Sequence, residues 1–316
     1  MVKAFIDGQA GTTGLGIRQR LLQHPAVELL EIDPQLRKDD AARKAMFQAA
    51  DIAFLCLPDQ AAREAAALAA DCRVRLLDAS TAHRTAPGWA YGFPELSEAR
   101  RAAVAGGDRI AVPGCHASGM IALAYPLIQA GILSMDAPLS FVSITGYTGG
   151  GNQMIAQYTD PGRSPQLDAP RQYALGQAHK HLPEVCAQCG LAIPPAFLPV
   201  VGDFPRGMLV TLPLHKSFFT KAATPGDVRE IYAAHYGESP VVQVLPVGAE
   251  AAEAGFLSAN AKAGKDNMEL LVTGNDARLL VHARFDNLGK GASGAALQCM
   301  NTVSYTHLTL PTIYSV

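Results

Sequence analysis

The chain has 316 residues, a formal net charge of −2 at pH 7 and an apolar fraction of 49%. This length accommodates one large domain or two ordinary ones. A near-neutral charge without a basic stripe argues against a nucleic-acid-binding surface, and no apolar run is long enough to span a bilayer. The N-terminus shows no signal peptide, and the six scattered cysteines are typical of reduced thiols. We therefore expect a cytoplasmic protein without nucleic-acid or membrane partners.

The N-terminal third alternates strand and helix patterns. Short apolar strands are predicted at residues 2–7, 27–33, 51–58 and 74–80, with amphipathic or Ala-rich helices between them. The third strand is nearly all apolar, as expected for a parallel strand that is covered on both faces. Repeated strand–helix units joined by right-handed crossovers predict an α/β fold with a doubly wound parallel sheet.

The turn after the first strand, GQAGTTGLG, is rich in glycine. Gly8, Gly11 and Gly14 are spaced as G-x-x-G-x-x-G, and Thr12 and Thr13 separate the last two. Glycines here allow the backbone to turn sharply and to approach a pyrophosphate, which the N-terminus of the following helix would bind. A purely structural turn is the alternative, but the place directly after the first strand favours a dinucleotide site.

The segment after the second strand usually decides between NAD and NADP. Asp33 stands where an acid would accept a hydrogen bond from a ribose 2′-hydroxyl, whereas Arg37 and Lys38 offer the cations that a 2′-phosphate requires. The two cations favour NADP. Solvated surface charges are the alternative interpretation of Arg37 and Lys38, and Asp33 keeps the coenzyme preference open.

Polar residues also follow the fourth strand, at the sheet edge where ligands bind in such folds. Ser80, His83 and Arg84 lie in the segment DASTAHRTAPGWAYGFPEL. A guanidinium suits bidentate recognition of phosphate or carboxylate, so these residues are candidates for substrate binding. A loop arginine paired with a nearby acid is the structural alternative.

Cys115 follows Pro113 and Gly114 and precedes HASGMIALAYPLIQAGIL, whose apolar spacing predicts a helix. The positive end of a helix dipole favours the thiolate, which is the nucleophilic form of cysteine. We therefore predict a reactive thiol at Cys115. A small buried hydrophobic side chain is the alternative.

A cysteine nucleophile needs a partner that transfers protons. The stretch HKHLPE supplies His179 and His181, while His83 and His116 lie nearer to Cys115 in the sequence. We predict no metal site, because residues i and i+2 of a helix point apart and nothing nearby completes a ligand set. The CAQC pair, Cys186 and Cys189, has no second pair and is interpreted as a coincidence of helix spacing.

Seven segments together resemble the N-acetyl-gamma-glutamyl-phosphate reductase family, and in particular its shorter bacterial form. They run in order from residue 7 to about residue 301 and read DGQAGTTGLGI, DIAFLCLPD, LLDASTAHRTAPGWAYGFPEL, AVPGCHASG, SITGYTGGGNQM, HKHLPE and FDNLGKGASGAALQ. Each segment alone is unspecific, whereas the combination is highly specific.

The resemblance implies a two-domain architecture like that of glyceraldehyde-3-phosphate and aspartate-semialdehyde dehydrogenases. Residues 1–115 and 287–301 would form an NADP-binding Rossmann domain. Residues 116–286 would form an inserted α+β domain for catalysis, substrate binding and oligomerisation, and strand patterns such as LSFVSITG and RLLVHARFD fit it. The expected assembly is a homo-oligomer, either a dimer or a tetramer.

The resemblance also implies the chemistry. Cys115 would attack N-acetyl-glutamyl 5-phosphate and form a thioester, which NADPH reduces to the semialdehyde, a step of arginine biosynthesis. His179, in preference to His181, would act as acid and base. The coenzyme would contact the glycine turn together with Cys56, Leu57, Pro58 and Asn287. The substrate would contact Ser80, His83, Arg84, Gly149, Gly150 and Asn152.

Two alternatives remain. A related enzyme could reduce aspartyl phosphate or a carrier-bound aminoadipyl phosphate by the same chemistry, and assays with each acyl phosphate separate these substrates. A protein of another class could sense nucleotide without catalysis. The intact PGCHASG and HKHLPE segments argue against that second alternative.

Residues 302–316, TVSYTHLTLPTIYSV, break the Ala-rich helical pattern that ends near Asn301. The stretch VSYTHL can be encoded by a transposon-end sequencing adaptor. We therefore expect a non-native tail that packs poorly and carries no functional residue. A native β-prone tail that packs on a neighbour is the alternative.

Overall fold

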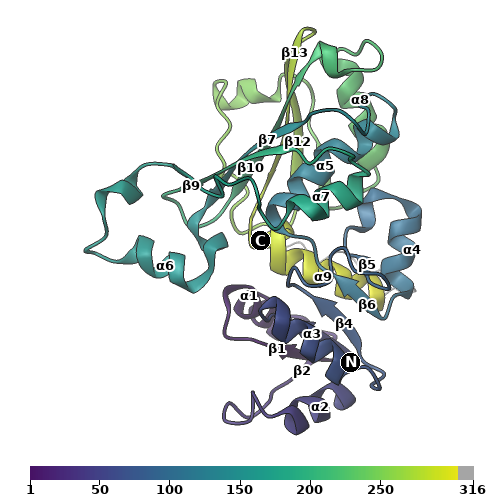
Figure 1. Cartoon of the computed structure of the whole chain (residues 1–316), viewed down its shortest axis with the longest axis vertical. Coiled ribbons are helices and arrows are strands. Elements are labelled where there is room, and N and C mark those ends of the chain that lie inside the picture. Colours follow the sequence, from purple (N-terminus) through teal and green to yellow (C-terminus); the bar gives the residue numbers. More distant parts are fainter. Residues whose placement is uncertain (305–316) are drawn as a thin grey trace. The chain divides into compact units, whose positions relative to one another are not determined.

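The computed structural model describes residues 1–304, which form two compact units, each with its own sheet (Figure 1). The first unit contains Met1–Gly114 and residues 292–304, and the second contains Cys115–Gly291. Within the described residues, no helix has both the length and the apolar character needed to cross a membrane.

The first unit is built on a six-stranded parallel sheet, which confirms the predicted doubly wound α/β fold. Its spatial strand order is β2-β1-β3-β4-β6-β5. The strands are β1 (Val2–Asp7), β2 (Val27–Leu30), β3 (Ile52–Leu55), β4 (Arg75–Asp78), β5 (Ala90–Tyr91) and β6 (Arg109–Ala111). Strand β2 lies on one side of β1, and β3, the next strand in the chain, lies on the other side of β1. The order therefore reverses between β1 and β3, and such switch points are where ligands bind.

Helices cover both faces of this sheet because the side chains of each strand alternate between them. They are α1 (Thr12–Leu22), α2 (Asp40–Ala49), α3 (Asp59–Leu68), α4 (Glu98–Gly106) and α9 (Gly294–Ser304), with a short 3₁₀ turn at Pro94–Leu96. On β3, Ile52 and Phe54 pack with α1, α4 and α9, whereas Ala53 and Leu55 pack with α2 and α3. This two-sided burial explains the unbroken apolar run that the sequence shows.

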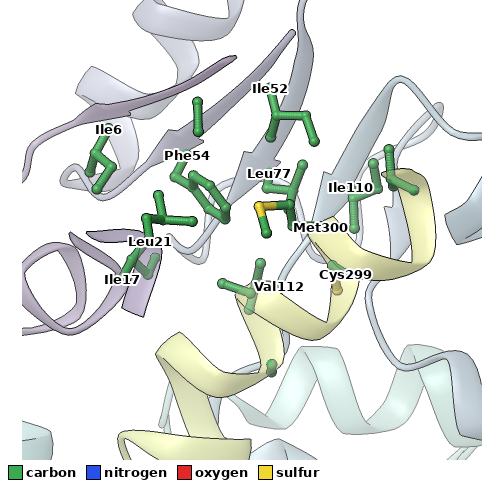
Figure 2. Packing of buried hydrophobic residues seen from close by; sticks show 14 of the residues in the cluster. Ile6, Ile17, Leu21, Ile52, Phe54, Leu77, Ile110, Val112, Cys299 and Met300 are labelled. Atoms are coloured by element: carbon green, nitrogen blue, oxygen red, sulfur yellow. The ribbon is translucent and has the colours of Figure 1, made fainter. Parts of the chain in front are cut away.

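The last helix, α9, returns to this sheet from the far end of the chain. Cys299 and Met300 are fully buried and lie in one cluster with Phe54, Leu77 and Ile110, as Figure 2 shows. The core of the first unit is therefore completed by residues almost two hundred positions beyond its strands.

The second unit holds a seven-stranded mixed sheet of order β11-β12-β13-β10-β7-β9-β8. Its strands are β7 (Ser140–Gly146), β8 (Arg171–Gln172), β9 (Ala196–Gly202), β10 (Met208–His215), β11 (Val242–Val244), β12 (Met268–Asn275) and β13 (Arg278–Phe285). Its helices are α5 (Cys115–Gln129), α6 (Gly151–Thr159), α7 (Leu182–Cys189) and α8 (Pro225–Tyr236), with 3₁₀ turns at Tyr147–Gly150, Pro165–Asp168, Lys216–Phe218 and Ala249–Glu253. A π-helical turn, Gly289–Ser293, precedes α9.

Helix α5 lies unusually close to the sheet of the second unit. A Cβ on Gly119 would meet Val210 Cγ2 at 2.5 Å, so only glycine permits this approach. Pro126 has no N–H to donate to the carbonyl of Ala122, and Tyr236 of α8 donates its hydroxyl to that carbonyl at 3.1 Å instead. The helix is thus fixed along its length, and so is its first residue, Cys115.

Helix α9 extends three residues beyond the end expected at Asn301. Val303 is 4% exposed and belongs to the core cluster, because it follows Cys299 and Met300 at helical spacing. Its carbonyl accepts a hydrogen bond from Arg75 Nη1 at 3.0 Å. The expectation that the chain packs poorly from residue 302 is therefore wrong for Val303. The remainder of the expected tail, residues 305–316, lies outside the described residues.

The burial of Val303 predicts a difference between two shortened chains. A chain that ends at Asn301 should be less stable than one that ends at Ser304 by about 1.5–3 kcal/mol, the value of a buried aliphatic side chain. Urea denaturation measures the difference. Val303→Ser in the chain that ends at Ser304 is the control and should account for most of the loss. Equal midpoints for all three proteins would contradict the packing of Val303.

Candidate functional site

The glycine turn after β1 lies against the chain that leaves β3. Gly8 has φ +91°, and a Cβ there would overlap the carbonyl oxygen of Cys56 and lie 2.9 Å from Leu57 Cδ2. A Cβ on Gly14 would meet the carbonyl oxygen of Gly8 at 2.7 Å, whereas one on Gly11 meets nothing closer than 3.9 Å. The close approach of the β1 and β3 ends thus depends on Gly8, and the close packing of α1 on the preceding turn depends on Gly14.

Two helices begin at this switch point. Gly11 is the N-cap of α1 and has no side chain with which to cap the amides of the first turn, which starts with Thr12 and Thr13. Pro58 is the N-cap of α3 and makes no side-chain capping bond either. The first turn of α1 contains no acidic residue, whereas that of α3 contains Asp59, so the N-terminus of α1 is the one suited to an anion such as a pyrophosphate.

The segment after β2 carries the residues that were expected to decide the coenzyme. Asp33 accepts the N–H of Gln35 at 2.8 Å through Oδ1 and so closes a local turn. Arg37 and Lys38 are exposed in the same turn. These two side chains are therefore accessible to a charged ligand.

A further cation, which the sequence analysis did not identify, is committed to an ion pair. Arg43 of α2 contacts the buried Asp7 at the end of β1, with Nη2 2.8 Å from Oδ2. Burial raises the pKa of Asp7, and Arg43 opposes this shift. The Arg43 charge is thus balanced within the protein.

The segment after β4 is organised by a carboxylate that the sequence analysis also missed. Asp78 is fully buried, accepts the N–H and the hydroxyl of Ser80, and lies 2.6 Å from Nδ1 of His83. The His83 ring stacks on Trp89 at 3.9 Å. Ser80 and His83 are therefore braced by Asp78, and their assignment to substrate binding stays a prediction.

Arg84 is 8% exposed and bonds to main-chain oxygens. Its Nε donates to Val112 O at 2.9 Å and its Nη2 donates to Ala79 O at 3.2 Å. It thereby ties the end of β4 to the chain three residues before Cys115. Its proposed contact with a substrate phosphate also stays a prediction.

Cys115 opens α5, as the sequence predicted, and is partly exposed. The backbone of Gly291 approaches it so closely that a Cβ there would lie 3.0 Å from the Cys115 Cβ. Other thiols are held in the unreactive form: burial raises the pKa of Cys56 to about 12 and also raises that of Cys189. Cys115 stands at the start of a fifteen-residue helix, where the helix dipole favours an anion.

The two histidines of HKHLPE lie together rather than apart. They belong to the turn before α7, which starts at Leu182, and their ring centroids are 4.7 Å apart. The expectation that they point in different directions assumed a helix at this position and is wrong. Both rings pack on His116, at 5.5 Å for His179 and 5.6 Å for His181.

His179 is the more accessible of this pair, since His181 is only 4% exposed. Its Nδ1 accepts the N–H of His181 at 3.2 Å. Burial, followed by the charge of Lys180, lowers the pKa of His179 to about 4. The imidazole of His179 is therefore uncharged at neutral pH.

The loop after β7 contains the remaining predicted contacts. Asn287 is 1% exposed, accepts the N–H of Gly207 at 2.9 Å and donates to Thr148 Oγ1 at 3.0 Å, so its amide braces two loops of the second unit. Gly149, Gly150 and Asn152, which follow Thr148 in the chain, are exposed. Their contacts with substrate, and that of Asn287 with the nicotinamide, stay predictions.

Among the described residues, no group of three or more His, Cys, Asp or Glu side chains is placed to hold a metal ion. The histidine cluster is held by hydroxyl groups instead: His116 lies 2.7 Å from Ser143 Oγ and 2.6 Å from Tyr173 Oη. His116 could have been singled out from the sequence, because it is a polar residue in an apolar helix. Ser143 and Tyr173 carried no such signal.

A parallel sheet with a glycine turn, followed by a mixed-sheet unit that opens with a cysteine, defines the semialdehyde dehydrogenase class. The semialdehyde dehydrogenase NAD binding domain matches residues 31–104, and the semialdehyde dehydrogenase dimerisation domain matches residues 115–287. An aspartate semialdehyde dehydrogenase structure from Francisella tularensis has a TM-score of 0.72, with 13% identity, and the match covers 95% of this chain and 99% of that one.

Within this class, the chain belongs to the N-acetyl-gamma-glutamyl-phosphate reductase family. It is 44% identical to the protein of that name from Sinorhizobium fredii over 303 residues, which is 95% of this chain and 97% of the relative. The Sinorhizobium medicae relative is 45% identical with the same coverage. The match spans both units, and it confirms the family resemblance and the two-domain fold.

The glycine turn gives a direct test of the backbone geometry. Gly8→Ala and Gly14→Ala should each destabilise the protein by about 1–3 kcal/mol, because the added Cβ overlaps main-chain atoms and, at Gly8, imposes a strained φ. Gly11→Ala is the control and should change stability by less than about 1 kcal/mol. Urea denaturation reads out all three variants, and a loss at Gly11 equal to that at Gly14 would contradict the geometry.

Proposed function

We propose that this chain catalyses the NADPH-dependent reduction of N-acetyl-glutamyl 5-phosphate to N-acetyl-glutamate 5-semialdehyde and phosphate in arginine biosynthesis. The observation that carries the proposal is the position of Cys115 as the first residue of the buried helix α5, next to a histidine cluster, in a chain whose full-length relatives bear the reductase name. The names of these relatives support the substrate class, and the geometry supports the proposed residue roles.

The first unit is proposed to bind NADP(H). Gly8, Gly11, Thr12, Thr13 and Gly14 would hold the pyrophosphate, because α1 begins in this turn with an N-cap, Gly11, that has no side chain. Cys56, Leu57 and Pro58 would face the coenzyme from the neighbouring strand end, and Arg37 and Lys38 would meet the 2′-phosphate. When bound, the nicotinamide supplies the hydride for the reduction.

Cys115 is proposed as the nucleophile. Its thiolate attacks the acyl carbon, the C–O bond to phosphate breaks, and phosphate leaves with the bonding electrons, so that a thioester remains. After the hydride reaches the same carbon, the C–S bond breaks, the electrons return to sulfur and the aldehyde is released. The helix dipole of α5 stabilises the anionic sulfur at both stages.

His179 is proposed as the acid–base group of this cycle. It is neutral, more exposed than His181 and near the start of α5 through its contact with His116. It would take the thiol proton before the attack and return it when the thiolate is released. Ser80, His83, Arg84, Gly149, Gly150 and Asn152 remain the candidates for substrate contacts, and Asn287 for the nicotinamide.

The roles of the two units and the assembly are part of the proposal. Residues 1–115 and 287–301 would bind coenzyme, residues 116–286 would bind substrate and mediate homo-oligomerisation, and residues 302–316 would contain no residue that contacts coenzyme or substrate. We place the enzyme in the cytoplasm, where its small-molecule substrate and reduced thiols are expected.

Cys115→Ser tests the covalent mechanism. The variant should lose reduction of N-acetyl-glutamyl phosphate by at least about 10³-fold and still bind NADPH, because a serine hydroxyl at neutral pH is a far weaker nucleophile than a thiolate. Oxidation of NADPH at 340 nm measures activity, and fluorescence titration measures binding. Turnover within about tenfold of the parent would exclude Cys115 as nucleophile.

The two histidines of the HKHLPE turn should differ in their effect on turnover. His179→Asn should lower kcat by about 10²–10⁴-fold, the usual value of a positioned acid–base group, and His181→Asn should lower it less. Because the pKa of His179 is about 4, the acid limb of kcat/KM that this group causes should lie near pH 4 and not near 6.5. The reverse order of the two variants would transfer the role to His181.

Coenzyme choice is tested at the exposed cations. Changing both Arg37 and Lys38 to Ser should raise the KM for NADPH about tenfold or more, since charge-assisted bonds to the 2′-phosphate are lost, and should leave the KM for NADH nearly unchanged. Asp33→Ser should shift the preference further toward NADPH. An equal effect on both coenzymes would show that Arg37 and Lys38 are ordinary surface charges.

A further inference from the structure

His116 follows the proposed nucleophile directly and is only 3% exposed. Its ring is held at both nitrogens, with Nδ1 2.7 Å from Ser143 Oγ on β7 and Nε2 2.6 Å from Tyr173 Oη. Ser143 is fully buried. Since rotation of this ring would leave buried polar groups without partners, its orientation is fixed.

The ring of the proposed acid–base group packs on this imidazole. His179 meets His116 edge to face, at 5.5 Å and 86°, and Phe197 contacts both rings, at 5.2 Å from His116 and 5.1 Å from His179. Tyr173 also lies 6.1 Å from His179. His116 is thus the shared neighbour of every aromatic side chain that surrounds His179 here.

His116 and Tyr173 both keep their uncharged forms, so the hydrogen bond between them persists. Burial, followed by the charges of His179 and Lys180, lowers the pKa of His116 to about 3, so the imidazole is neutral and carries one N–H. Burial raises the pKa of the Tyr173 phenol, and Cys115 is the second cause of that shift. The phenol therefore keeps its proton within the electrostatic field of the thiol.

The segment between Tyr173 and His179 is held in an uncommon conformation. Ala174 and Gln177 have φ of 51° and 54°, values that cost non-glycine residues about 1 kcal/mol or more each. The side-chain amide of Gln177 compensates, since its Nε2 donates to Phe197 O at 2.8 Å and its Oε1 accepts the Phe197 N–H at 2.9 Å. The Gln177 amide thus ties this segment to Phe197 on β9.

We propose that His116 is a positioning residue for the reaction at Cys115. Its Nδ1 is anchored on the buried Ser143, and its Nε2 holds the Tyr173 hydroxyl in place. The same ring packs on the His179 imidazole and keeps it in one orientation near the start of α5. The inference rests on the proposed function only in that Cys115 and His179 carry the reaction. His116 itself neither takes nor gives a proton in the cycle.

The test compares His116→Phe, Tyr173→Phe and the double variant in the full chain. Each single change should lower kcat about 10–100-fold with little change in KM, because a misplaced acid–base group costs rate and not substrate affinity. The double variant should lose no more than the worse single variant, since all three lack the same hydrogen bond. His116→Gln, whose amide reaches toward Tyr173, should retain more activity than His116→Asn, whose shorter amide reaches only Ser143.

His282 provides the matched control. It is also buried in the second unit with both ring nitrogens near hydroxyls, 2.9 Å from Thr211 Oγ1 and 3.0 Å from Thr273 Oγ1. Burial, followed by Arg284, lowers its pKa to about 4. His282→Phe should lower the Tm as His116→Phe does and leave kcat unchanged.

A second readout does not depend on the substrate. Alkylation of Cys115 by iodoacetamide, followed by mass spectrometry across pH, should show a higher midpoint in His116→Phe and Tyr173→Phe and the parent midpoint in His282→Phe, because a displaced His179 takes up the thiol proton less readily. Unchanged midpoints, multiplied losses in the double variant, or an equal kcat loss in His282→Phe would overturn the proposal. A parent protein that is alkylated but does not reduce the acyl phosphate would refute the proposed function, while the alkylation series would still decide the role of His116.

Discussion

The confinement of helix α5 is the constraint on which the second unit depends. Eleven of its fifteen residues are buried, and Gly119 allows it to lie directly on Val210 of the sheet. Tyr236 satisfies a carbonyl that Pro126 leaves without its helical partner. A helix held at so many points cannot slide or rotate without leaving cavities or unpaired polar groups, so the thiol at its first residue has one defined position.

The first unit uses close backbone approach and buried acids for the same purpose. Gly8 lacks the Cβ atom that would separate the ends of β1 and β3, and Gly14 lacks the one that would separate α1 from the turn after β1. At the carboxyl ends of two strands, Asp7 and Asp78 hold side chains from α2 and from the segment after β4. These acids restrict loops that would otherwise be mobile, and a sheet edge with restricted loops can present its amides to a ligand with little ordering cost.

The histidine cluster shows how a polar site is stabilised inside an apolar environment. His116 and His179 both have pKa values lowered first by burial, so neither brings a charge into the cluster. Hydroxyl and main-chain groups supply the hydrogen bonds that neutral imidazoles need. The site therefore avoids the cost of buried charge and keeps its proton-accepting groups in the uncharged form.

The sequence by itself determined the parallel sheet, the glycine turn and the thiol at a helix start, because local periodicity and residue type specify each of them within a short window. It did not determine that the rings of His179 and His181 both pack on His116. Their separation was predicted for a helix, whereas the two residues lie in the turn before α7. Nor did the sequence show that Asp78 fixes Ser80 and His83, or that Val303 completes a core built two hundred residues earlier. Only the tertiary structure decided the contacts of His116 with Ser143 and Tyr173, which lie dozens of residues away in the chain. Hydrogen bonds and packing depend on distance in space, and they leave no periodic pattern in the sequence.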